Sequence, residues 1–74
     1  MIQPKPMSRQ LVATVDEVLA ASGLAFLRDD EDHEWTVTRS TPGADLADMQ
    51  PGQKWQVVVD VYPDFAIATR VAPH

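Results

Sequence analysis

The sequence contains no cysteine, which excludes disulfide bonds and zinc sites built on cysteine. Its three glycines do not form a glycine-rich phosphate-binding loop. No apolar stretch approaches the roughly 18 residues that a membrane-spanning helix needs. The first residues also lack the apolar run of a signal peptide. From these absences we expect a cytoplasmic protein that does not interact with membranes.

Positive charge is also scarce. Eleven acidic residues against six Lys and Arg give a formal net charge of −5. The six basic residues are scattered along the chain, whereas a nucleic-acid-binding protein needs clustered Lys and Arg to displace phosphate counterions. The charge therefore disfavours direct nucleic-acid binding and favours a protein partner with a basic surface.

The length of 74 residues predicts a single domain over residues 1–74, because two separate cores would each be too small. Residues 1–7 are expected to form an extended N-terminal lead-in, since prolines disfavour helix in the residues before them. Over residues 8–22 the apolar side chains fall on one face of a helix that Gly23 would end. That face consists of Leu11, Val12, Val15, Val18 and Leu19.

Four later segments have the β-branched or alternating pattern of strands, namely residues 24–27, 35–39, 54–62 and 65–71. In the last of them Phe65 and Ile67 are expected to face inward. Residues 40–53 form the longest irregular stretch, in which Leu46 and Met49 would point toward the core. The predicted fold class is α+β, with one N-terminal helix packed on a three- to four-stranded antiparallel sheet in the order α-β-β-β-β.

Chemistry-bearing residues are sparse. His33 and His74 are the only histidines, and neither lies at a catalytic spacing from a nucleophile. The acidic run at residues 29–34 lacks the glycine and the alternating oxygen ligands of a calcium loop. We therefore predict that the protein is not an enzyme and has no catalytic residue, no cofactor-binding residue and no metal ligand.

Two surfaces are candidates for protein binding. The first is the acidic turn, defined as residues 29–34, although a solvated hairpin turn is the ordinary interpretation of such a run. The second is the outer face of the predicted sheet, where apolar residues flanked by alanines would form a modest patch. The predicted protein-binding residues are Asp29, Asp30, Glu31, Asp32, Glu34, Val58, Tyr62 and Arg70.

The two tryptophans have two interpretations. Trp35 and Trp55 both fall on the apolar face of a predicted strand, which favours a place in the core. Tryptophan is also enriched among the residues that dominate binding energy at interfaces, so one of the two could instead anchor a partner.

Together these features predict a non-enzymatic, acidic protein-binding domain. A stoichiometric inhibitor of the phage anti-defence, antitoxin or immunity type, or an accessory subunit, would fit this description. One alternative is a homo-oligomeric structural or regulatory subunit, for example a homodimer built through an edge strand. Another is a module that binds a small ligand.

Overall fold

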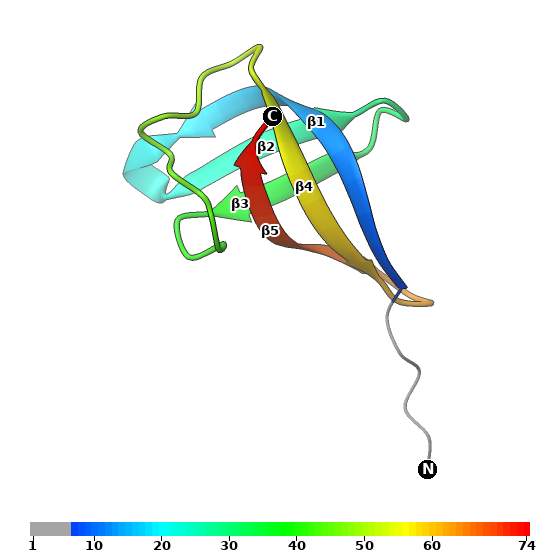
Figure 1. The fold of residues 1–74 in the computed structure, drawn as a ribbon. Helices are drawn as coiled ribbons and strands as arrows, with labels where there is room; N and C mark the ends of the chain where they lie inside the picture. The colour runs from blue at the N-terminus through cyan, green and yellow to red at the C-terminus, as the bar shows by residue number, and fades with distance from the viewer. Residues whose placement is uncertain (1–6) are drawn as a thin grey trace.

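The computed structural model describes residues 7–74, which form one antiparallel sheet of five strands (Figure 1). The strands lie side by side in the order β3-β2-β1-β4-β5. Within the described residues the only helical element is a 3-10 turn, η1 (Ala20–Ser22). The strands are β1 (Met7–Leu19), β2 (Leu24–Asp29), β3 (Glu34–Thr38), β4 (Lys54–Val61) and β5 (Ala66–Pro73).

The predicted helix over residues 8–22 is wrong, and so is the α+β class. This segment is β1, a strand of 13 residues that pairs with β4 through residues 7–14 and with β2 through residues 13–19. The register against β2 shifts between Val15 and Glu17, which places a bulge at Asp16. The chain is therefore a strand that bends where it changes partner.

The same bulge explains why the apolar residues of this segment have the spacing expected for a helix. Up to Val15 the inward-facing residues alternate, and the extra residue at Asp16 moves the next one to Val18. Leu11, Val15 and Val18 are consequently four and three residues apart, which is the spacing of a helical face. The β-branched side chains of this segment favour the strand. Leu19, expected in the core, is instead 38% exposed.

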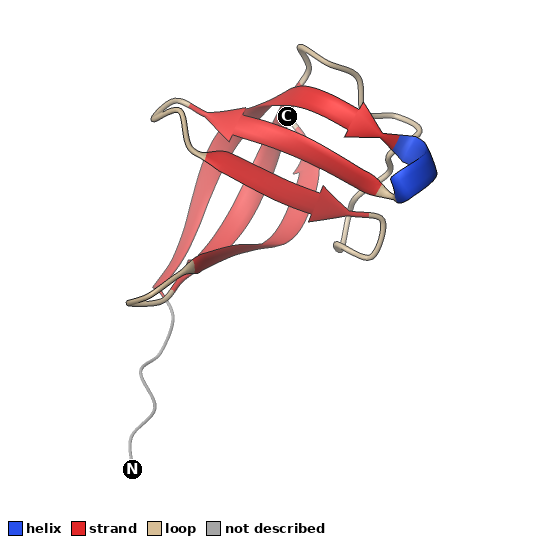
Figure 2. Ribbon diagram, turned by 180° about the vertical axis from the view of Figure 1, so that it is seen from behind, coloured by secondary structure: helices blue, strands red, loops and turns tan. Residues whose placement is uncertain are grey.

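Each of the four segments predicted as strands is a strand, with bounds that differ by a few residues. The first three strands form a meander, and β4 returns through residues 39–53 to lie beside β1. That arrangement is a Greek key. The sheet curls into a half-barrel (Figure 2), and this arrangement resembles the partly open, five-stranded Greek-key barrel of OB-folds.

The core lies inside the curl and consists mainly of small and β-branched residues. Both tryptophans belong to it, with Trp35 7% and Trp55 3% exposed. Met49 is 3% exposed and Leu46 packs against the core, so the expected inward orientation of both is confirmed. The buried residues are Ala13, Val15, Ala25, Leu27, Trp35, Val37, Met49, Trp55, Val57, Val59 and Val71.

A second bulge changes which residues of β5 face the core. Val58 pairs with Arg70 but Val59 pairs with Ala68, which leaves Thr69 as the extra residue. Ala66 and Ala68 therefore pack against the core. The prediction that Phe65 and Ile67 face inward is wrong, since they are 57% and 45% exposed.

The half-barrel is closed at one end by the β3–β4 connection. The edge strands β3 and β5 contact each other but are not hydrogen-bonded. Beyond the end of β3, the carbonyl oxygen of Pro42 accepts a hydrogen bond of 2.9 Å from the backbone N–H of Val71 in β5. Gly43 follows with a φ of 83°, and a Cβ at this position would lie 1.9 Å from the Val71 carbonyl oxygen. Only glycine allows the backbone to approach β5 so closely.

We expect Gly43→Ala to destabilise the fold strongly. The matched control is Gly52→Ala, because Gly52 has a similar φ of 91° but no atom within 4 Å of the position that a methyl group would take. Backbone strain at positive φ costs about 1–3 kcal/mol in either variant. The clash at Val71 adds about 1–3 kcal/mol in Gly43→Ala only. Urea unfolding measures both, and equal losses would contradict this account of the closed end.

Candidate functional site

The opposite end of the half-barrel is open and forms a cleft. β3 and β5 both begin at this end, and the cleft between them has a volume of about 510 Å³. Residues of β1, β3, β4, β5 and the acidic turn line it. Its floor is apolar and is formed by buried or half-buried side chains, which are Leu11, Trp35, Val59, Val61 and Ala66. A volume of this size lies within the range of ligand-binding pockets.

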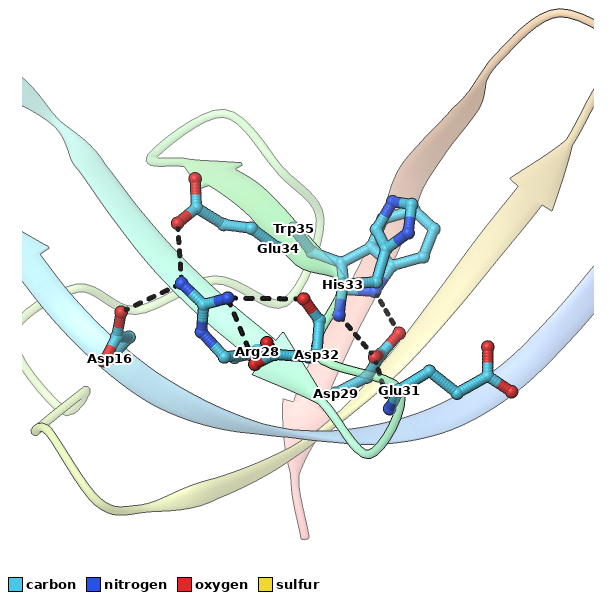
Figure 3. Close-up of polar contacts among 8 residues, drawn as sticks. All are labelled: Asp16, Arg28, Asp29, Glu31, Asp32, His33, Glu34 and Trp35. Carbon is cyan, nitrogen blue, oxygen red and sulfur yellow. Dashed lines mark hydrogen bonds and ion pairs between the residues drawn. The ribbon is translucent and has the colours of Figure 1, made fainter.

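One carboxylate organises the wall formed by the acidic turn. Asp29 Oδ1 accepts hydrogen bonds of 2.9 Å from the backbone N–H groups of Glu31 and His33 (Figure 3). Asp29 Oδ2 accepts the indole N–H of Trp35 at 2.8 Å. The His33 ring stacks on Trp35, with ring centroids 4.7 Å apart. Asp29 therefore fixes both the turn and the tryptophan below it.

The environment of Asp29 also changes its pKa. Burial alone raises it, but the hydrogen bonds from Trp35, His33 and Glu31 favour the charged form and together lower the pKa of Asp29 below its ordinary value. The carboxylate thus stays ionised and remains an acceptor for all three donors.

A second cluster of charged side chains forms around Arg28. The guanidinium of Arg28 forms ion pairs with Asp32 at 3.2 Å, Glu34 at 3.4 Å and Asp16 at 3.6 Å (Figure 3). These carboxylates, Asp32 above all, raise the pKa of Arg28. Of the predicted acidic site residues, Asp32 and Glu34 are therefore occupied within the turn itself.

Two acidic side chains are left over. Asp30 and Glu31 are exposed, line the cleft and have no side-chain partner among the described residues. Arg9 of β1 lines the same cleft and is likewise free of ion pairs within residues 7–74. The mouth of the cleft thus carries unpaired charges of both signs above an apolar floor.

The sequence prediction missed Arg9 and Leu11 as residues of the cleft. The signal that finds them is the alternation of β1, because odd-numbered residues from Met7 to Val15 face the concave side once this segment is treated as a strand. The assignment of residues 8–22 to a helix concealed that alternation.

The predicted outer patch lies on the other face of the sheet. Val58 pairs with Arg70 on the side opposite the buried Val57 and Val59. Tyr62 stacks on Phe65 in the β4–β5 turn, with centroids 4.6 Å apart. The alanines expected to flank this patch face the core instead, so its apolar character comes from the exposed Phe65 and Ile67.

In OB-folds, oligonucleotides bind to the face of strands 2 and 3 and to the adjoining loops. On the β2–β3 hairpin of this chain the cation is Arg28, whose guanidinium is already shared among three carboxylates. Phosphate binding requires free Lys and Arg. The architecture alone does not assign that function to this chain.

Within residues 7–74 no group of three or more histidine, aspartate or glutamate side chains is arranged to hold a metal ion. The described part of the chain also has no helix that is long and apolar enough to cross a membrane. No protein-family model matches the sequence, and comparisons with curated proteins and with solved structures find no match.

We expect Asp29→Asn to lower the free energy of unfolding at neutral pH by about 1–3 kcal/mol, because an amide group cannot accept all three hydrogen bonds. The folded-state pKa of Asp29 is lowered, so its stabilisation is complete above the unfolded pKa of about 4 and is lost as the pH falls through the folded value. The stability difference between the two proteins should therefore shrink in acid. Denaturant unfolding from pH 7 to pH 2 measures it, and a difference that is constant with pH would contradict this role.

Proposed function

We propose that this protein is a non-enzymatic protein-binding domain whose open-end cleft receives a basic segment of a partner. The observation that supports this most is the combination of an apolar floor with two unpaired carboxylates, Asp30 and Glu31, at its mouth. Lys and Arg fit such a site, because their aliphatic stems pack on apolar surface while their charged ends stay at the edge.

Charge favours the same class of partner over the whole molecule. A net charge of −5 attracts basic surfaces and raises the rate of encounter with them. It also opposes nucleic acids and a second copy of the chain. A homo-oligomer is for this reason a weaker alternative.

The composition of the cleft favours binding over catalysis. Its lining contains no serine, threonine, lysine or tyrosine beside His33 that could act as a nucleophile. The His33 ring stacks on Trp35, and its neighbouring carboxylate Asp29 is engaged by three donors. We therefore propose no reaction for this site.

A small ligand is the second candidate occupant. The volume of about 510 Å³ suits one, and a lining that contains Arg9 as well as Asp30 and Glu31 would suit a molecule that carries both charges. Such a ligand would depend on Arg9 for affinity, whereas a basic segment would be repelled by it. The sign of the Arg9→Ala effect therefore distinguishes the two.

A capped peptide of alternating Val and Lys residues serves as the probe, and NMR titration measures its Kd. We expect the double variant Asp30→Lys, Glu31→Lys to weaken binding about tenfold or more at low salt, because attraction becomes repulsion. Arg9→Ala should strengthen binding about two- to threefold.

The control is the double variant Glu17→Lys, Asp48→Lys, which makes the same change in net charge at two exposed residues outside the cleft lining. It should change the Kd less than twofold. If the Asp30→Lys, Glu31→Lys variant binds as tightly as the original protein, or no more weakly than the control, the proposed site is refuted.

A further inference from the structure

The edge of β5 beside the cleft is open. β5 pairs with β4 on one side, and its only hydrogen bond to the described chain on the other side is the one from Val71 to Pro42. Between the β4–β5 turn and the bulge at Thr69, residues 66–68 have no backbone partner beyond β4 within residues 7–74. Unpaired edge groups of this kind are templates for the backbone of another chain.

The protein already shows that this edge can pair with the backbone of another segment. At the closed end, the segment with Pro42 and Gly43 lies against β5 and accepts the Val71 N–H at 2.9 Å. The open end has the same strand edge without such a segment. Because Ala66 also lines the cleft, a chain entering the cleft comes directly alongside this edge.

The side chains near the edge differ between its two faces. On the concave face, a neighbouring strand would meet the apolar floor and, across the cleft, Asp30 and Glu31. On the outer face it would meet Ile67, which pairs with Asp60 on β4 and is 45% exposed. Cross-strand apolar pairs stabilise a sheet, and alternate residues of a strand face opposite sides.

We propose that the partner segment binds as an added strand along the edge of β5 at residues 66–68. Its cleft-facing residue is Lys or Arg, and the residues on either side of it are apolar and pack beside Ile67. This inference rests on the proposed function and specifies the backbone conformation and the sequence pattern of the segment.

A second copy of the chain is not the proposed occupant. Two copies would bring net charges of −5 together, whereas a basic segment is attracted. Light scattering of the peptide-free protein at the concentration of the experiment checks this point, and a stable dimer that dissociates on addition of peptide would overturn the proposal in favour of self-pairing.

The test uses the alternating Val and Lys peptide in two forms, each N-methylated at alternate residues so that the backbone donors of one edge only are removed. We expect one form to bind at least tenfold more weakly than the unmethylated peptide, and the other to stay within about threefold. Hydrogen exchange in the complex should slow at one or more amides of residues 66–68, while residues 24–27 of β2, which lie outside the cleft lining, serve as the internal reference.

A substitution on the outer face tests the contribution of that face to binding separately from the contribution of the cleft. Ile67→Ser should weaken binding about threefold, and the control Leu19→Ser, at a similarly exposed residue of β1, should leave it unchanged. Equal binding of both methylated forms with unchanged exchange in β5 would overturn strand addition. If the peptide still required Asp30 and Glu31, the proposed function would stand; if it did not, the proposed function would fail separately.

Discussion

A chain of 74 residues can enclose a core with a single sheet only if that sheet curls, and β1 provides the curl. It pairs with β4 through residues 7–14 and with β2 through residues 13–19, and the bulge at Asp16 falls where this change is complete. Just before this bulge, the side of β1 that β4 has left pairs with the β3–β4 connection, because Val15 exchanges backbone hydrogen bonds of 2.8 Å with Gly52 and Gln53. The bend therefore brings the β2–β3 hairpin over β4 and β5 and creates the interior.

The two ends of this interior differ because the gap between the two edge strands is covered at one end only. β3 and β5 contact each other without hydrogen bonds, and this unbonded line between the two strands is called the seam. At the end of β3 the chain continues through Pro42 and Gly43 and covers the seam, and Leu46 and Met49 fill the space below. At the start of β3 the acidic turn stands apart from β5, and Asp29 holds it there through Trp35. The open-end cleft is thus the uncovered half of the seam.

Local patterns predicted four of the five strands, because residues 24–27 and 54–62 combine β-branched side chains with clear turn signals. They failed where a bulge shifts the alternation. In β1 the extra residue at Asp16 gave the spacing of a helix, and in β5 the extra Thr69 reversed the faces of Ile67 and Ala66. A bulge depends on register against the neighbouring strand, which a single segment does not contain. The cleft was missed for the same reason, since Arg9 and Leu11 line it only when β1 is a strand.

The acidic turn shows why a count of charges is not enough to define a binding surface. Arg28 holds Asp16, Asp32 and Glu34 within 3.6 Å, and Asp29 is enclosed by three donors. At distances beyond a Debye length of about 8 Å these groups contribute only to the weak field of the net charge. At contact, a partner meets the two carboxylates that remain free. The rate of encounter should therefore follow the net charge of the whole chain, whereas the lifetime of a complex should follow Asp30, Glu31 and the apolar floor beneath them.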